Sequence, residues 1–283
     1  MRAPVAVAPM RLARAPTCRL PPSVDNDEQG FVIRQALDWQ QFATWATWWE
    51  AGSTGADEAR VYALVGQMAS AGEQLALAHA AGVEVALWQE SREAGESDVE
   101  DEMGMRGMAE AQCHFVIATG HALANVAVRA LAMSRVRRAD LAEQFKRSDG
   151  DFDPFSSDRN DWVPLNARTC FGLREVARAS GQQPVIELTE CIARVGCGTI
   201  WRSLLERRNE DFHRWRPQSY GVAGVPRCSP WERESGVRTL RIGTLPYEEA
   251  QGLAQEVATL ARDGMFELAH AMGAFAERWP AAS

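Results

Sequence analysis

The stretch MRGMAEAQCHFVIATGHALANVAVRALAMSRVRR, residues 105–138, decides the fold class of this chain. Its apolar residues follow the periodicity of one face of an α-helix. These positions include Phe115, Ile117, Leu123, Val126, Val128 and Leu131. Arg135, Arg137 and Arg138 fall in the last turns, where positive charge complements the carbonyl end of a helix. The pattern predicts a long helix with one face in a core.

The same periodicity recurs over most of the chain, and it predicts an all-α protein. Further helices are expected at 38–50, 57–90, 164–179, 184–213 and about 244–279. Prolines and glycines between 217 and 245 predict an irregular connection with one short strand near 240–243. We expect a helical bundle of four to five core helices with an additional N-terminal helical segment.

Three parts are expected along the chain. Residues 1–30 are predicted to be a disordered arm, because residues 1–24 hold four arginines, five prolines and no acid. Residues 31–104 are predicted to form an N-terminal helical segment and an acidic loop, since seven acids and one arginine lie between 90 and 102. Residues 105–283 are then predicted to be the bundle.

Composition narrows the class of protein. The net charge of −8 is not that of a generic polyanion binder. Of the 30 basic residues only Lys146 is a lysine, and guanidinium groups suit bidentate contacts with phosphate. No apolar run approaches the roughly 20 residues that cross a bilayer, so we expect no membrane partner.

The six cysteines are scattered without a Cys-x-x-Cys pair or a zinc-ligand spacing. This pattern favours buried free thiols in a reducing cytoplasm, with a Cys191–Cys197 disulfide or metal site as the alternative. Sequence signatures of dinucleotide-binding proteins, nucleoside triphosphatases, serine hydrolases and zinc proteases are absent. We expect neither a metal nor another cofactor.

The motif that carries chemistry is Arg208-Asn209-Glu210-Asp211-Phe212-His213, at the end of the apolar segment 184–213. On a helix, the row of Trp201 and Leu205 continues into Asn209 and His213, and Arg208 flanks it. We therefore expect these three polar side chains to extend a core-facing surface. Asn209 and His213 lie one turn apart, which suits an amide that orients an imidazole.

These residue types match the cleavage of RNA, which carries its own nucleophile, the 2′-hydroxyl. His213 can take the proton of that hydroxyl or give one to the leaving 5′-oxygen, and Arg208 can hold the phosphate. Asn209 would position His213 or a phosphate oxygen. Nearby basic residues would contact the RNA: Arg202, Arg207, Arg214 and Arg216. Because one histidine does not easily act as base and acid at once, we expect a homodimer whose two motifs share one cleft.

This stretch resembles the HEPN family (higher eukaryotes and prokaryotes nucleotide-binding), whose members have arginine, four to six residues, then histidine on small helical bundles. Asparagine directly after the arginine matches Arg208-Asn209 here. The resemblance implies a metal-independent endoribonuclease of toxin or antiviral (phage) defence type, with a composite dimer site and a possible cognate inhibitor protein. It covers about residues 105–279 and leaves the first hundred residues unexplained. The tyrosine two positions after the histidine in one version is replaced by Trp215.

Other interpretations compete with this hypothesis. Arg208 and His213 could cap a helix end and pair with nearby acids, as in a catalytically dead relative or an unrelated helical protein. The tryptophan-rich segment 38–50 could be the contact surface of a non-catalytic interaction module. A small-molecule-binding helical protein would have a closed apolar pocket lined by the third and fifth predicted helices, 105–138 and 184–213. We expect His114 and His121 to be satisfied core or surface histidines.

Overall fold

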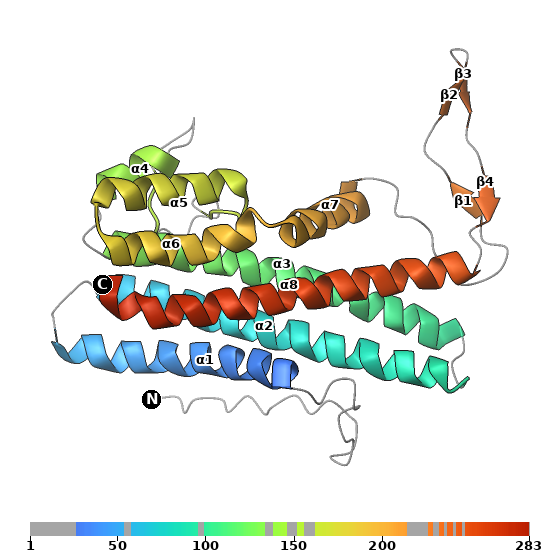
Figure 1. Cartoon of the computed structure of the whole chain (residues 1–283), viewed down its shortest axis with the longest axis horizontal. Coiled ribbons are helices and arrows are strands. Elements are labelled where there is room, and N and C mark those ends of the chain that lie inside the picture. Colours follow the sequence, from blue (N-terminus) through green and yellow to red (C-terminus); the bar gives the residue numbers. More distant parts are fainter. Residues whose placement is uncertain are drawn as a thin grey trace, which may run out of the picture.

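The structure, a computed structural model, is a bundle of four long helices with a layer of shorter helices on one side (Figure 1). It describes residues 27–53, 58–95, 99–133, 138–145, 152–155 and 162–213, four short strands within 226–244, and residues 247–282. The long helices are α1 (Asp27–Ser53), α2 (Glu58–Glu93), α3 (Val99–Met133) and α8 (Tyr247–Ala282). The expected all-α fold is confirmed.

The four long helices enclose one hydrophobic core. Helices α1, α3 and α8 run in the same direction and α2 runs against them (Figure 1). The core joins fully buried side chains from all four, among them Trp39, Leu75, Leu123 and Phe275. Trp39 also donates its indole N–H to the carbonyl oxygen of Met272 at 3.1 Å, which ties α1 to α8. Burial of large apolar side chains is the main stabilising term of such a bundle.

The chain between α3 and α8 forms the outer layer. It contains α4 (Arg138–Phe145), α5 (Ala167–Ser180), α6 (Gln183–Gly196) and α7 (Thr199–His213). Helix α6 packs on α8 and α3, α5 packs on α6, and α7 packs on α8 and α3. Two antiparallel pairs of short strands follow, β1 (Pro226–Cys228) with β4 (Ile242–Thr244) and β2 (Glu232–Glu234) with β3 (Val237–Thr239). The outer layer thus brings α7 against the bundle.

The predicted domain boundaries differ from the observed elements. Helix α1 already begins at Asp27, inside the predicted arm 1–30, and the boundary at 104/105 falls within α3. Helices α1 and α2 share one core with α3 and α8, so 31–104 is not a separate segment. Most of the predicted acidic loop is helical, because α2 extends to Glu93 and α3 begins at Val99.

The predicted fifth helix, 184–213, is two helices. Helix α6 ends at Gly196 and α7 begins at Thr199. Gly196 lies against the side chains of Cys170 and Leu165, where a Cβ would be 2.7 Å from Leu165 Cδ1. This close approach and the pair of glycines, Gly196 and Gly198, end the helix, since glycine weakens helical structure and permits tight packing. The break sets the direction of α7 independently of α6.

Among the described residues, one helix has the length and composition to cross a membrane. It is the part of α3 from Gly104 to Met133, and 83% of its most apolar window is buried inside the protein. The expectation that no apolar run approaches the length of a span is therefore wrong for α3. Burial on this scale is typical of a core helix, which must be apolar on most sides when other helices surround it.

Two glycines of α3 are expected to respond in opposite ways to replacement by alanine. A Cβ at Gly120 would overlap the indole of Trp201, which is held by its hydrogen bond to Leu165, so Gly120→Ala should destabilise by about 2 kcal/mol. A Cβ at Gly107 meets nothing within 4 Å. Gly107→Ala should therefore stabilise by about 0.5–1 kcal/mol through helix propensity. Urea unfolding measures both changes, and equal signs would contradict the packing of α7 on Gly120.

Candidate functional site

The predicted catalytic residues lie in the last two turns of α7, which is continuous from Thr199 to His213. Arg208 is half-buried and Asn209 is exposed. The side chain of His213 lies outside the described residues, although its backbone completes the helix. Asn209 and His213 are therefore one turn apart on one helix. Asn209 was expected on a core-facing surface, but its side chain is exposed to solvent.

Arg208 has no partner among the described residues that would explain it as a helix cap. Its guanidinium forms no hydrogen bond or ion pair with any of them, and Glu206, one of the acids considered, is exposed on the same helix. The described electrostatic neighbour of Arg208 is His121 of α3, whose pKa its charge lowers. The tertiary structure thus brings a second imidazole to the motif.

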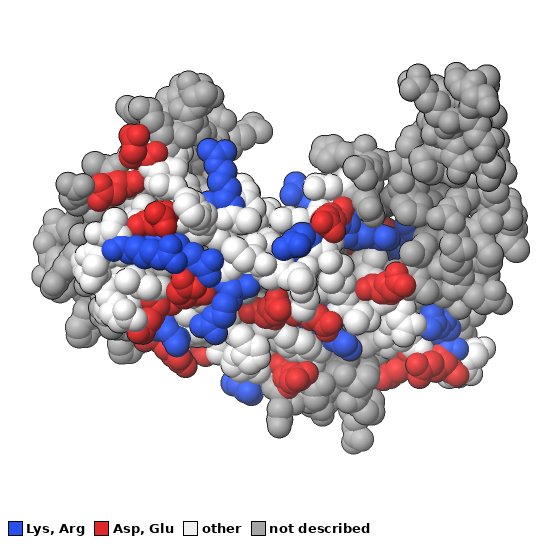
Figure 2. Space-filling view, turned by 45° about the horizontal axis from the view of Figure 1, so that its top comes forward, with Lys and Arg blue, Asp and Glu red and all other residues white. Residues whose placement is uncertain are grey.

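Two of the four predicted RNA-contacting arginines lie among the residues that the structure describes. Arg202 is exposed and Arg207 is half-buried on α7, whereas Arg214 and Arg216 lie outside the described residues. Figure 2 shows basic side chains interspersed with acidic ones, without an unbroken basic patch on the described part of this face. Any polyanion contact here would be local to the motif, in keeping with the net charge of −8.

His121 is held by the extended segment that precedes α5. Its Nδ1 accepts the backbone N–H of Leu165 at 3.0 Å, and its ring meets that of Trp201 edge-on at 5.9 Å. The Trp201 indole in turn donates to the Leu165 carbonyl oxygen at 3.0 Å. The expectation of a satisfied histidine therefore holds for the Nδ1 of His121. Since Nδ1 is an acceptor, the proton of the neutral ring is on Nε2.

The chemical character of His121 follows from this arrangement. Burial first, and then the charge of Arg208, lower the pKa of its imidazole to about 4. Near neutral pH the ring is therefore uncharged, and it cannot serve as a base through Nδ1, which is occupied. Its Nε2–H forms no hydrogen bond with another described residue. The ring can donate one hydrogen bond to an anion that Arg208 also attracts.

Asn125, one turn further along α3, fastens the same segment. Its Nδ2 donates to the Val163 carbonyl oxygen at 2.8 Å, and its Oδ1 accepts the Val163 N–H at 3.0 Å. Nδ2 also donates to the His121 carbonyl oxygen at 2.7 Å. Side chains of α3 and α7 thus satisfy the backbone groups that a neighbouring strand would otherwise satisfy. The position of His121 relative to α7 depends on this attachment.

Acid is expected to destabilise the protein between pH 6.5 and about pH 4. The unfolded chain binds a proton at His121 below 6.5, its ordinary pKa, while the folded chain does so only below about 4. Stability is therefore full above pH 6.5 and falls, by about 3 kcal/mol, as the pH drops through this window. Urea unfolding at both limits should show a larger loss for the natural chain than for His121→Gln. Equal losses would contradict the buried, neutral state of His121.

Sequence reasoning did not connect His121 with the motif. Eighty-odd positions separate it from Arg208, and nothing in the local pattern of α3 distinguishes it from His114. The only available signal was its place on the apolar stretch 105–138, which favours a core position. The pairing arises because α7 packs across α3 at Gly120 and His121.

Two cavities lie away from the motif. One, of about 260 Å³, lies between α6 and α8 and is lined by residues that include Cys191, Arg194, Glu267 and His270. A smaller polar cavity of about 150 Å³ is lined by glutamines of α1, α2, α3 and α8 together with Arg262. Neither is the closed apolar pocket between the third and fifth predicted helices that a small-molecule-binding protein was expected to have.

Comparison with known proteins does not identify the family of this chain. No protein-family model, no curated protein and no solved structure matches the chain. Within the part of the chain that the structure describes, no three His, Cys, Asp or Glu side chains are grouped to hold a metal ion. Function must therefore be inferred from the chemistry of the residues themselves.

Proposed function

We propose that the protein is a metal-independent endoribonuclease of HEPN type, acting in a toxin or phage-defence role in the cytoplasm. The observation that carries the proposal is the end of α7. There, Arg208 without an ion pair to any described residue, exposed Asn209 and the backbone of His213 follow one another on a continuous helix. A guanidinium is suited to bind phosphate through bidentate, charge-assisted hydrogen bonds.

The proposed reaction uses the 2′-hydroxyl of RNA as nucleophile. His213 transfers protons between this hydroxyl and the leaving 5′-oxygen, Arg208 offsets the charge that develops on the phosphate oxygens, and Asn209 orients His213. His121 adds a neutral N–H donor on the flank of Arg208. Arg202, Arg207, Arg214 and Arg216 would contact the backbone of the RNA on either side.

A homodimer would complete the site. Two-fold symmetry brings two copies of His213 to one cleft, so that one copy acts as base while the other acts as acid. The exposure of Asn209 and the position of α7 on the outside of the bundle support such an arrangement. A cognate inhibitor protein that covers this surface would keep the enzyme inactive.

RNA incubated with the full-length protein and a chelator tests the proposal. We expect cleavage that leaves 2′,3′-cyclic phosphate ends, because the 2′-hydroxyl attacks the adjacent phosphate. His213→Ala should abolish this cleavage, whereas His270→Ala, which removes an exposed histidine of α8, should not change it. Absence of cleavage by the natural chain as a purified dimer, or equal cleavage by His213→Ala, would contradict the proposal.

The cavity between α6 and α8 favours a second candidate function, the binding of a small molecule. Glu267 Oε2 is buried there and has no hydrogen-bond partner within the described structure. Burial first, and then the charge of Asp263, raise the pKa of the Glu267 carboxyl. A small ligand with a hydrogen-bond donor would satisfy that oxygen. For a non-catalytic interaction module, Trp39 of the tryptophan-rich helix is unsuited as a contact residue because it is in the core. The side chains of Trp45, Trp48 and Trp49 lie outside the described residues.

A further inference from the structure

Two cysteines from different helices meet at the turn between α6 and α7. Cys170 of α5 is fully buried, and Cys197, directly after α6, is exposed. The Cys170 sulfur lies against Gly196, so closely that a Cβ at Gly196 would overlap it. Since Gly196 is the residue before Cys197, the buried sulfur reaches the backbone that carries the exposed one.

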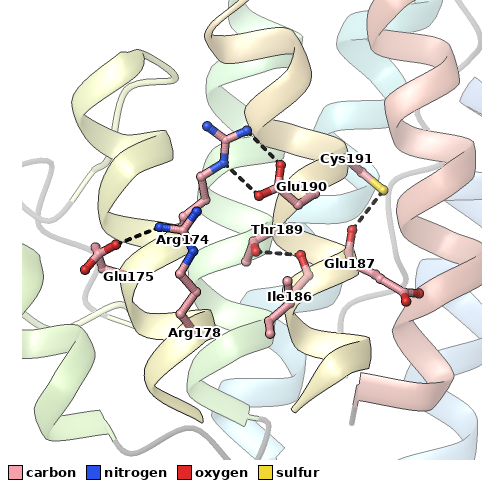
Figure 3. A network of polar contacts seen from close by, with 8 residues as sticks. All are labelled: Arg174, Glu175, Arg178, Ile186, Glu187, Thr189, Glu190 and Cys191. Carbon is pink, nitrogen blue, oxygen red and sulfur yellow. Dashed lines mark hydrogen bonds and ion pairs between the residues drawn. The ribbon is translucent and has the colours of Figure 1, made fainter. Parts of the chain in front are cut away.

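The polar surroundings also place the two sulfurs together. Burial first, and then the neighbouring Cys197, raise the pKa of Cys170 to about 12. Arg174, one turn after Cys170, interacts electrostatically with both cysteines. Its guanidinium is held in place by two hydrogen bonds to Glu190, at 2.9 and 2.7 Å (Figure 3). The guanidinium of Arg174, held in a fixed position, therefore interacts electrostatically with both sulfurs.

Cys191, the partner considered for Cys197 from the sequence, faces elsewhere. Its thiol donates to the Glu187 carbonyl oxygen at 3.2 Å and points away from Arg174 (Figure 3). It lines the cavity between α6 and α8 with Glu267 and His270. Cys170 is therefore the cysteine within reach of Cys197.

We propose that Cys170 and Cys197 are a redox-sensitive pair that forms an intramolecular disulfide when the protein meets a peroxide. The exposed Cys197 is the group that the oxidant reaches, and the buried Cys170 is the resolving thiol beside it. Neighbouring thiols of this kind, one accessible and one protected, are typical of reversible oxidation sites. The proposal does not depend on ribonuclease activity.

The chemistry takes place in two balanced steps. The Cys197 thiolate attacks hydrogen peroxide, so that an S–O bond forms, the O–O bond breaks, and hydroxide leaves as the sulfur is oxidised to the sulfenic acid. The Cys170 sulfur then attacks the Cys197 sulfur, forming the S–S bond as the S–O bond breaks. The departing oxygen leaves as water with the Cys170 proton. Overall, two thiols and one peroxide give one disulfide and two waters.

The disulfide would join α5 to the turn where α7 begins. Thr199, the first residue of α7, comes two positions after Cys197. The bond closes the loop from 170 to 197 and so restricts the unfolded chain, which is expected to raise the melting temperature by about 5 °C. Oxidation would also fix the start of the helix that carries Arg208.

Treatment of the full-length protein with dilute hydrogen peroxide tests the proposal. Non-reducing peptide mapping should find one peptide pair linked through Cys170 and Cys197, and dithiothreitol should reverse both this link and the rise in melting temperature. Cys197→Ser, at an exposed position, should show neither change. Cys191→Ser is the matched control and should behave as the natural chain does.

Three results would overturn the inference. The first is the absence of a Cys170–Cys197 link when Cys197 has been oxidised. The second is a link from Cys197 to Cys191 or to another cysteine in its place. The third is an unchanged thermal shift in Cys197→Ser, which would assign the effect to other residues.

Discussion

Asn125→Ala is expected to lower the free energy of unfolding by about 4 kcal/mol, the largest effect that we predict for a single polar side chain. Asn125 satisfies both backbone groups of Val163, and both residues are buried. Removing the amide leaves a buried N–H and a buried carbonyl oxygen without partners, at about 1–3 kcal/mol each. The packing of Val163 in the core, with 4% of its surface exposed, leaves little room for a replacing water.

Thr119→Ala is the matched control for this substitution. Thr119 is also buried on α3, but its hydroxyl donates only to the Phe115 carbonyl oxygen of its own helix, at 2.8 Å. Its loss should therefore destabilise by about 1 kcal/mol. Urea unfolding gives both values, and amide hydrogen exchange at Val163 and Leu165 reports whether the segment detaches locally. Equal destabilisation by the two variants would contradict the role of Asn125.

Arg208→Ala is expected to lower the rate of RNA cleavage by about 100- to 1000-fold, if the proposed function is correct. The guanidinium would offset charge that is greatest in the transition state, so its loss should reduce kcat more than it weakens RNA binding. Half-burial of Arg208 strengthens the effect, because charges interact more strongly where water is partly excluded. Cleavage of a labelled RNA under single-turnover conditions separates the rate from the affinity.

Arg202→Ala on the same helix provides the comparison for Arg208. Arg202 is exposed and is proposed to contact only the RNA backbone. Its replacement should weaken binding and reduce the salt dependence of affinity, while the maximal rate stays close to that of the natural chain. If both variants changed only affinity, Arg208 would be a binding residue and the proposed mechanism would be wrong.

Much of the fold could be predicted from local pattern. The apolar periodicity of 57–90 and 244–279 predicts α2 and α8 to within three residues at each end. The predicted helix 105–138 starts six residues after the start of α3, which ends at Met133, and Arg138 is the first residue of α4. The end of α5 at Ser180 was also predicted, and Gly181 there has the positive φ of 66° that favours glycine. Such signals are local, because each turn of a helix depends on residues three and four positions apart.

Predictions failed where tertiary contacts decide. The break between α6 and α7 was missed because the apolar pattern continues through it, and the reason for it is the contact of Gly196 with Cys170 and Leu165. The separation of 31–104 from the bundle failed because amphipathic patterns show which face is buried but not which helix buries it. The short strand predicted near 240–243, by contrast, overlaps the observed strand β4 at Ile242–Thr244.

For the candidate site, the motif on α7 and the order of its residues along one helix could be predicted from the local pattern of residues. The packing of distant elements brings His121 to Arg208, Asn125 to Val163 and Cys170 to the backbone before Cys197. The physical reason is the separation along the sequence of the residues that interact. Helical periodicity results from hydrogen bonds between neighbouring turns, whereas these pairs join elements that are distant in sequence and meet only when α5 and α7 pack on their neighbours.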